Sequence, residues 1–365
     1  MNLKFAFIIF ALSIVSSCNT SSTFEVLPTE ITKNTCLKKH TSYYAESSVN
    51  ILKSGVLTIE QGVDLTLCDT CSIYCDGQIV ANGSEFDPIY INTSGAEVSL
   101  YFKHSNLSST FKNTHFTNTA LFFNNSEIRI DSCSFKVLPF ETKNKISSFV
   151  ISSYKSNVYI ENSSFLGNNL NEGLAINKGS CLIRNNKFLY LPDAIELSNL
   201  EDALITGNKI SYSNDDGIDL NNCKNIIISY NNIEYSKDKG ISIGSKEIVS
   251  KEETIRINHN LITNNKIGIA VKLNSLVDIS NCILEGNSTG LAFPITGNIL
   301  TNALSEVNST FFVNNENNTN TSEYSSFKFW NCYSDLSLAG KNNPLNLASP
   351  NLNSLRKTIH LHLPL

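Results

Sequence analysis

The segments LIRNNKF (residues 182–188), LITGNKI (204–210) and IIISYNNI (226–233) share one pattern: an apolar strand, a small polar residue, then another apolar residue. The pattern also occurs at IRIDSCSF (128–135), YIENSSF (159–165), IRINHNLI (255–262) and VDISNCIL (277–284). The small polar residues are, in order, Cys133, Ser163, Asn186, Asn208, Asn231, Asn260 and Cys282. They recur about every 22 positions, with occasional insertions of about seven, and a period of this length is typical of a solenoid.

A second series of strands runs out of phase with the first, and each copy begins with Gly or Ala followed by apolar-x-apolar. The copies start at Gly173, Ala194, Gly217, Gly240, Gly268 and Gly290. Alternation and β-branched residues indicate strands, with no helical period between them. A leucine-rich repeat would need leucine at fixed positions, whereas Ile, Val and Phe exchange freely here. The sequence therefore predicts an all-β fold, a single-stranded right-handed parallel β-helix of about 22 residues per coil.

The small polar column has a structural interpretation. Coils stacked about 4.8 Å apart pile equivalent residues into continuous columns. The asparagines are expected to form an internal ladder, bonding to one another and to the turn backbone. Cys133 and Cys282 share this column and are predicted to be buried thiols.

The start of the chain predicts export. Lys4 precedes an apolar stretch over residues 5–15 and the sequence VSSC, which ends at Cys18. This is the pattern of a secretory signal peptide, and VSSC resembles a bacterial lipobox. The resemblance implies a lipidated Cys18 and anchoring at the outer membrane or cell surface. An ordinary signal peptide, and hence secretion, is the alternative.

Length and charge limit the classes of partner. The 365 residues, 41% of them apolar, suffice for one elongated core. The net charge of −5 gives no reason to expect nucleic acid or an anionic membrane surface as partner. A monomer is expected.

The chain divides into four predicted segments. Residues 1–18 form a lipoprotein-type signal peptide, 19–35 a polar linker, 36–335 the β-helix, and 336–365 a C-terminal cap or disordered tail. Within the β-helix, residues 36–49 are expected to cap the first coil. The cluster of Cys68, Cys71 and Cys75 predicts a disulfide within the first coils, with Cys36 as one candidate partner.

The early coils carry a family resemblance. GVLTIEQGVDL (55–65) and GQIVANGSEFDPIYI (77–91) resemble the opening coils of bacterial surface β-helix proteins. The resemblance implies this architecture over roughly residues 50–330 and does not specify an activity.

Carboxylates gather at one turn of several consecutive coils, just before the second strand series. Stacking the coils brings together Asp193, Asp215, Asp216, Asp238 and Lys239. Glu196 and Asp219 alternate with inward apolar residues and are expected to point outward beside them. Like charges about 5 Å apart repel, so the patch implies a bound cation, raised pKa values or good solvation. Asp193, Asp215 and Asp216 are the candidate Ca²⁺ ligands.

The same coils have a weaker resemblance to the polygalacturonase-type glycoside hydrolases. DAIEL, NDDGIDL, DKGISIGS and IAVK resemble the four consecutive catalytic motifs of that family. The resemblance implies catalytic roles for Asp193, Asp215, Asp216 and Lys272, in an inverting reaction in which an acid protonates the leaving oxygen and paired carboxylates activate water. Lys239 stands where the family has His, and Ala270 where it has Arg.

A polysaccharide lyase is a different enzyme class that occurs on the same fold. A cation held by the carboxylates would acidify the proton beside a uronate carboxyl group, and Lys239, near Asp216 and Asp238, would remove it. Both enzyme hypotheses name acidic polysaccharide as substrate.

Three tyrosines recur beside the acidic turns, at Tyr190, Tyr212 and Tyr235. If exposed, they would form a platform for sugar rings, because aromatic faces pack on apolar C–H surfaces. The alternative is an aromatic stack that only fills a corner of the coil.

These observations favour an exported module that binds an extracellular ligand, most readily carbohydrate, through one face. That face carries the predicted ligand-binding residues Glu196, Asp219, Asp238, Tyr190, Tyr212 and Tyr235. A polysaccharide-degrading enzyme using the same face, and a purely structural or adhesive protein, are the alternatives. An enzyme would need a cleft, and the insertion at residues 246–253 is the candidate wall.

Overall fold

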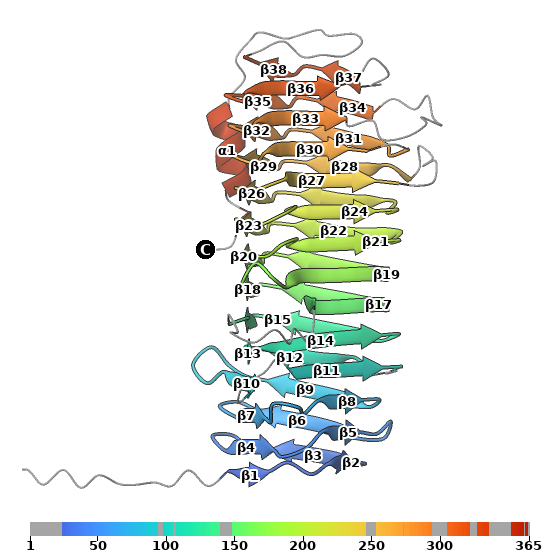
Figure 1. The fold of residues 1–365 in the computed structure, drawn as a ribbon, viewed down its shortest axis with the longest axis vertical. Coiled ribbons are helices and arrows are strands. Elements are labelled where there is room, and N and C mark those ends of the chain that lie inside the picture. Colours follow the sequence, from blue (N-terminus) through green and yellow to red (C-terminus); the bar gives the residue numbers. More distant parts are fainter. Residues whose placement is uncertain are drawn as a thin grey trace, which may run out of the picture.

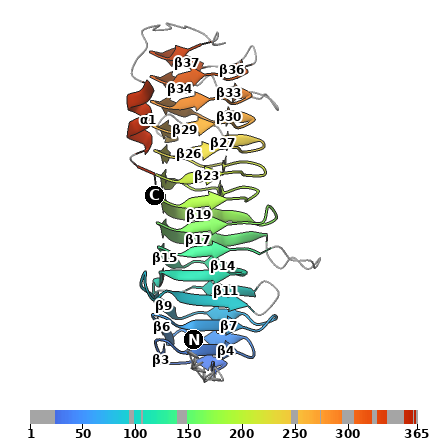
Figure 2. The ribbon, with the colours of Figure 1, turned by 90° about the vertical axis from the view of Figure 1, so that its left-hand side faces the viewer.

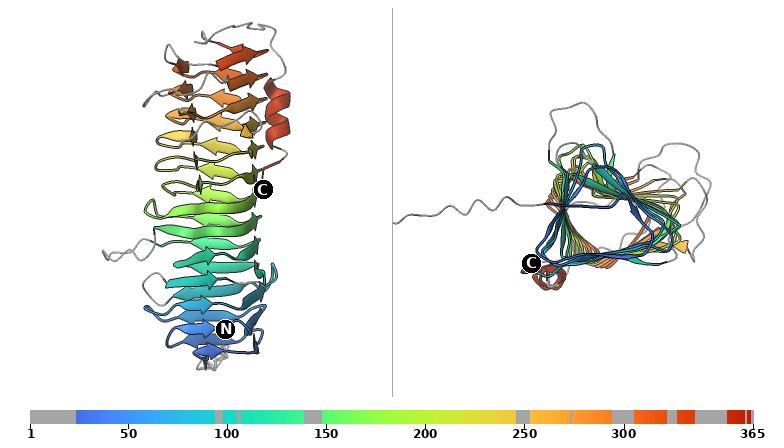
Figure 3. Two further views of the ribbon diagram at one scale, coloured as in Figure 1. Left: turned by 90° about the vertical axis from the view of Figure 1, so that its right-hand side faces the viewer. Right: turned by 90° about the horizontal axis from the view of Figure 1, so that it is seen from below.

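The computed structural model describes residues 24–93, 98–104, 107–138, 148–245, 253–272, 274–293, 305–321, 327–335, 352–360 and 362–363. Their strands stack into one elongated column (Figure 1), which has a three-sided outline when seen from below (Figure 3). Each strand pairs in parallel with its equivalents in the coils before and after it. The predicted parallel β-helix is confirmed.

Face A is the 14-stranded sheet. Its strands are β1 (Glu25–Val26), β4 (Ser42–Ala45), β7 (Asp64–Leu67), β10 (Ile89–Thr93), β13 (Thr114–Thr117), β16 (Ser134–Lys136), β18 (Ser164–Leu166), β20 (Lys187–Leu189), β23 (Lys209–Ser211), β26 (Asn232–Glu234), β29 (Leu261–Thr263), β32 (Ile283–Glu285), β35 (Phe311–Val313) and β38 (Tyr333–Ser334).

Face B follows face A along each coil. Its strands are β2 (Glu30–Ile31), β5 (Val49–Ile51), β8 (Ile73–Cys75), β11 (Val98–Lys103), β14 (Thr119–Asn124), the first parts of β17 (Phe149–Glu161) and β19 (Glu172–Arg184), β21 (Ile195–Ser198), β24 (Ile218–Asn221), β27 (Lys239–Gly244), β30 (Ile267–Val271), β33 (Thr289–Phe293) and β36 (Asn317–Thr321).

Face C completes each coil. Its strands are β3 (Asn34–Leu37), β6 (Val56–Glu60), β9 (Gln78–Asn82), β12 (Ser109–Lys112), β15 (Glu127–Asp131), the second parts of β17 and β19, β22 (Asp202–Thr206), β25 (Ile226–Ser229), β28 (Ile255–Asn258), β31 (Val277–Ser280), β34 (Ser305–Asn308) and β37 (Phe327–Trp330). Because β17 and β19 run through both faces, B and C form one continuous 24-stranded sheet.

The predicted asparagine ladder lies at the corner between faces C and A. The Asn231 amide oxygen accepts the backbone N–H of Asn208 at 2.9 Å, and its amide nitrogen donates to the carbonyl of Ile205 at 3.0 Å and to Asn260 Oδ1 at 2.9 Å. Asn208 bonds to Asn186 in the same way. All four asparagines are buried, so the ladder satisfies backbone groups that the corner would otherwise leave unpaired.

A second internal ladder, not predicted from the sequence, lies at the corner between faces A and B. The Asn265 N–H donates to Asn287 Oδ1, and the Asn287 N–H donates to Asn315 Oδ1, both at 2.9 Å. These asparagines are also buried. Both ends of face A in these coils are therefore held by side-chain amides.

Inward side chains of face A form a stack of phenylalanines at Phe116, Phe135, Phe165 and Phe188. Neighbouring ring centroids lie 4.6–4.7 Å apart, with interplanar angles of at most 10°. The predicted Gly/Ala column lies at the start of face B, where a side chain would collide with the next coil. A Cβ atom at Gly217 would approach the Gly240 carbonyl oxygen to 2.6 Å.

The solenoid begins earlier than predicted. Strands β1 and β2, which both lie within the predicted linker of residues 19–35, pair with β4 and β5. Residues 36–49 therefore belong to a regular coil and do not form a cap, because strands β1 and β2 already precede them in the stack. Among the described residues, the last strand is β38.

The C-terminal segment contains the helix α1 (Leu352–His360), which lies beside face A and not over the end of the column (Figures 1 and 2). Ile359 is buried against Leu261, Ile283 and Phe311, and Arg356 forms an ion pair with Glu285. Neither a terminal cap nor a disordered tail describes these residues, because the helix covers apolar side chains of face A.

Among the described residues, the cysteines comprise one disulfide-bonded pair, six buried thiols and the partly exposed Cys36. Cys68 and Cys71 form a disulfide, and Cys36, the candidate partner, is free. Cys133 and Cys282 are buried thiols as predicted, and burial raises the pKa of each to about 12. Cys18 and the predicted signal peptide lie outside the described residues.

Candidate functional site on face B and its entry turn

Asp193, Asp216 and Lys239 occupy equivalent positions on three consecutive coils, where the chain enters face B. The Asp216 N–H donates to Asp193 Oδ1 at 2.8 Å, and the Lys239 N–H donates to Asp216 Oδ1 at 2.9 Å. Each carboxylate therefore accepts the backbone N–H of the next coil. Asp193, Asp216 and Lys239, predicted from sequence to be neighbours, therefore lie next to one another on adjacent coils.

Burial changes the protonation of both carboxyl groups. It raises the pKa of Asp193 to about 7, with a further contribution from the charges of Asp216, Asp215 and Asp219 and against the hydrogen bond from the Asp216 N–H. It raises the pKa of Asp216 to about 6, although Lys239 acts in the opposite direction. Near neutral pH the pair therefore holds a proton for much of the time.

Lys239 is held between carboxylates. Its Nζ lies 3.3 Å from Asp216 Oδ1 and also bonds to Asp238, whose other oxygen lies 3.1 Å from Lys266 Nζ. Burial alone would lower the pKa of Lys239, but the hydrogen bonds and charges of Asp238 and Asp216 outweigh it and raise that pKa. Lys239 is therefore a fixed cation near neutral pH. The geometry does not support its predicted role as the base of a lyase, because a protonated amine cannot accept a proton.

Asp215 is exposed on the same turn. One carboxylate oxygen from each of Asp193, Asp215 and Asp216 can be chosen so that the three atoms lie within 4.8 Å of one another. Hard divalent cations such as Ca²⁺ prefer such oxygen ligands. The sequence-predicted calcium ligands are thus brought together, with the Lys239 ammonium group close by as a competing positive charge.

Glu196 and Asp219 lie side by side in register on the outer surface of face B, as predicted. Asn221 donates to Asp219 Oδ2 at 2.7 Å, and Lys272 Nζ lies 3.8 Å from Asp219 Oδ1. Lys272 comes from two coils further along and passes Gly244, where a Cβ atom would lie 3.2 Å from the lysine chain. Lys272 therefore belongs to the same surface, but its partner is Asp219 and not the Asp193–Asp216 pair.

The acidic strip is the name used below for these outward groups and the entry turn. It consists of Asp193, Glu196, Asp215, Asp216 and Asp219, with Lys239 and Lys272. Carboxylates outnumber ammonium groups in it, so an anionic polymer would be repelled unless a cation or bound protons compensated.

The three tyrosines form an exposed stack beside the acidic turns. The ring centroids of Tyr190 and Tyr212 lie 5.4 Å apart and those of Tyr212 and Tyr235 5.0 Å apart. The residues are 42%, 45% and 43% exposed, so the stack does not fill an interior corner. This exposure is what a platform for sugar rings requires.

The tyrosine backbones are in the left-handed region, with φ between 57° and 60°. The equivalent positions of the next two coils hold Asn264 and Gly286, which adopt this conformation at lower cost. Three successive tyrosines therefore occupy a corner where the backbone disfavours bulky residues, and such strain is often found at functional positions.

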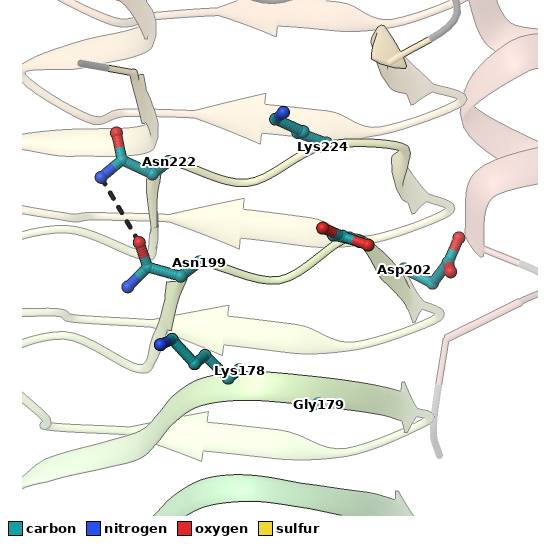
Figure 4. A pocket seen from close by; sticks show the side chains of 7 residues that line it. Lys178, Gly179, Asn199, Asp202, Asn222 and Lys224 are labelled. Carbon is teal, nitrogen blue, oxygen red and sulfur yellow. Dashed lines mark hydrogen bonds between the residues drawn. The ribbon is translucent and has the colours of Figure 1, made fainter. Parts of the chain in front are cut away.

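Two hollows flank the C-terminal end of strand β21. The first, of about 300 Å³, lies on face B beside Glu196 and was not predicted from the sequence. The second, of about 530 Å³, lies at the turn between faces B and C and is lined by polar groups that include Lys178, Asp202 and Lys224 (Figure 4). Two charged groups of the second hollow are already paired, since Lys224 bonds to Glu253 at 2.9 Å and Asp202 accepts from Asn225 at 2.6 Å.

The candidate wall of a cleft, residues 246–253, lies outside the described residues except for Glu253. Among the residues that the structure does describe, none belongs to a helix long and apolar enough to span a membrane.

Comparison with known proteins agrees with the fold. The right-handed β-helix region family matches residues 148–303 and 194–344, and the chain belongs to this family. The solved structures of two mutants of the periplasmic alginate epimerase AlgG have TM-scores of 0.62 and 0.54 to this chain, at 14% and 12% identity. The first alignment covers 82% of this chain and 79% of the AlgG chain, and the second covers 81% of this chain and 78% of the AlgG chain. No curated protein matches the sequence.

Proposed function

We propose that this protein is an exported module that binds polysaccharide along the acidic strip and the adjacent tyrosine stack. The observation that carries the proposal is the exposed stack of Tyr190, Tyr212 and Tyr235 on a strained backbone, on the same coils as the acidic turns. Sugar rings present apolar C–H faces to aromatic rings and hydroxyl groups to carboxylates. The likeness to AlgG supports the proposal, because an alginate epimerase acts on a polysaccharide and its structure has the fold of this chain.

The charge of the strip decides between classes of polysaccharide. A neutral glycan can bind through the tyrosines and hydrogen bonds to the carboxylates without any added ion. An acidic glycan needs a bridging cation, and Asp193, Asp215 and Asp216 would hold Ca²⁺ for it. Calcium-dependent binding would therefore identify an acidic ligand.

The proposal is tested by affinity electrophoresis against neutral and acidic polysaccharides, with and without Ca²⁺. Replacement of Tyr212 by Ala is expected to weaken binding about tenfold, because one stacking contact contributes roughly 1 kcal/mol or somewhat more. Tyr90→Ala is the matched control: Tyr90 is 43% exposed and also stacked on a neighbouring ring, but it lies on face A. Equal loss in both variants, or loss in neither, would contradict the proposal.

A catalytic role is the second candidate, and the raised pKa of Asp193 favours it. A carboxyl group with a pKa of about 7 can donate a proton to a leaving oxygen at neutral pH, while its ionised neighbour Asp216 stays paired with Lys239. Release of reducing ends that is lost in Asp193→Asn and Asp216→Asn would establish a hydrolase. Unsaturated products, followed by ultraviolet absorbance, would establish a lyase with a base other than Lys239. If the protein binds a polymer but cleaves none, the catalytic role is excluded and the binding role remains.

Export and lipidation at Cys18 belong to the same proposal. Labelling with radioactive palmitate is expected in the wild-type chain and not in Cys18→Ser. Release of unlabelled protein into the medium would instead indicate an ordinary signal peptide.

A further inference from the structure

The outward central column of face B changes character along the solenoid. In successive coils it carries Tyr74, Tyr101 and Phe122, which pair in register, and then Ser152 and Ala175. The next residue of the column is Glu196 of the acidic strip. The aromatic part, the small part and the acidic strip therefore form one straight line parallel to the long axis.

The aromatic part is an ordered stack. The ring centroids of Tyr74 and Tyr101 lie 5.3 Å apart with an interplanar angle of 9°, and those of Tyr101 and Phe122 lie 4.9 Å apart at 18°. Tyr74 is 42% exposed. Ser152 and Ala175 are too short to continue the stack, so the column drops to a lower level after Phe122.

The hollow of about 300 Å³ occupies this lower level. Ser152 and Ala175 lie on its central column, while Phe149 and Tyr154 come from the flanking positions of the same coil. Its far end is lined by Glu196 and other polar side chains. A depression bounded by aromatic rings with polar groups at one end fits a sugar ring, which has apolar faces and a hydroxylated edge.

Two ammonium groups lie near the outer wall of the hollow. Lys155 Nζ and Lys178 Nζ lie 5.3 Å and 5.8 Å from the centroid of the Tyr154 ring. Such contacts fix the orientation of the ring by cation–π attraction. These contacts favour one orientation of Tyr154, which is 41% exposed, and so lower the entropic cost of ordering it on binding.

We propose that the hollow is a subsite for one sugar ring, and that a polysaccharide chain lies along face B from Tyr74 to Asp219, parallel to the solenoid axis. The inference rests on the proposed function and extends it from the acidic strip to a second, aromatic region. The six coil steps between these residues span about 30 Å at ~4.8 Å each. The ligand is therefore a chain of several sugars and not a mono- or disaccharide.

The test measures affinity by calorimetry for a series of oligosaccharides of increasing length, prepared from a polysaccharide that the wild-type protein binds. Wild-type affinity is expected to rise with length until the chain spans both regions. Ser152→Tyr is expected to fill the hollow by continuing the existing stack, and Tyr154→Ala to remove its wall. Each should lower the affinity for long oligosaccharides at least tenfold and leave the shortest ones, bound at the acidic strip, unaffected.

Thr110→Tyr is the matched control, since it places the same ring at an outward position of face C. Melting curves of all three variants check that the fold is kept. Wild-type affinity in Ser152→Tyr and Tyr154→Ala at every length would overturn this inference while leaving the proposed function intact. Failure of the wild-type protein to bind any polysaccharide would overturn the proposed function and this inference with it.

Discussion

Replacement of Asp193 by Asn should stabilise the protein at high pH and leave its stability unchanged at low pH. The carboxyl group of Asp193 has its pKa raised from 3.8 to about 7, chiefly by burial. Because the folded state binds the proton more tightly than the unfolded chain, this group's favourable contribution is complete below pH 3.8 and is lost as the pH rises through about 7. Asn carries no charge, so the variant should not show this loss.

The size of the effect follows from the shift. A change of about three pKa units corresponds to about 4 kcal/mol at ~1.4 kcal/mol per unit. Asp193 is only partly buried, and solvent screens part of its interaction with the neighbouring carboxylates, so about 2 kcal/mol is expected. The Asn side-chain oxygen can still accept the Asp216 N–H, so the substitution removes the charge and keeps the hydrogen bond.

The assay is urea unfolding followed by far-ultraviolet circular dichroism, at a pH below 4 and at a pH above 8. Asp76→Asn, which changes an exposed carboxylate in the turn after β8, is the control and should have little effect at either pH. The reasoning is refuted if Asp193→Asn is no more stable than the wild-type protein at the higher pH. It is also refuted if the control gains as much stability.

Three further predictions concern the fold. Asn231→Ala should cost about 3–5 kcal/mol in the free energy of unfolding, because it removes four buried hydrogen bonds and leaves donors and acceptors unpaired. The control Asn177→Ala, which loses one exposed bond of 3.2 Å, should cost less than about 0.5 kcal/mol. Equal urea midpoints would show that the ladder does not stabilise the coil. Ile359→Asp should release α1 from face A and speed limited proteolysis of the C-terminal segment, with the melting temperature of the solenoid nearly unchanged; proteolysis at the wild-type rate would contradict this packing. Among the cysteines that the structure describes, only Cys36 should react readily with a thiol reagent in the native protein, because the other free thiols are buried; rapid reaction of further thiols would contradict it.

The repeating parts of this fold could be predicted from the sequence because each coil restates the same constraints. Neighbouring coils have the same residue type at the positions of Asn208 and Gly217. Because equivalent residues stack in register, the repeat alone predicts which residues are neighbours. The same logic placed Asp193 and Asp216 on adjacent coils and Glu196 beside Asp219.

Features that occur once could not be predicted in this way. The docking of α1 depends on contacts between Ile359 and an apolar patch on face A, and these contacts occur once and not in every coil. The early start at β1 rests on only two residues. The second asparagine ladder is itself a repeated feature and could have been predicted, since Asn265 and Asn287 each lie two residues after a strand of face A and two before a strand of face B.

Side-chain pairing also lies beyond a sequence pattern. Whether Lys239 is a base or a fixed cation depends on its distances to Asp216 and Asp238, which the repeat pattern does not give. The hollow depends on Ser152 and Ala175 following Phe122 in one column, a register that becomes visible only after the strands have been paired across insertions of different length.

The central claim is that polysaccharide binds along face B and its entry turn. Hydrogen–deuterium exchange of the protein with and without a bound polysaccharide tests it most directly, because exchange reports the position of the ligand along the chain. The account predicts slower exchange in the turns that carry Tyr190, Tyr212 and Tyr235 and in the face B strands from β8 to β24, with face C unchanged. Protection confined to faces A or C, or no protection by any polysaccharide that binds, would contradict it.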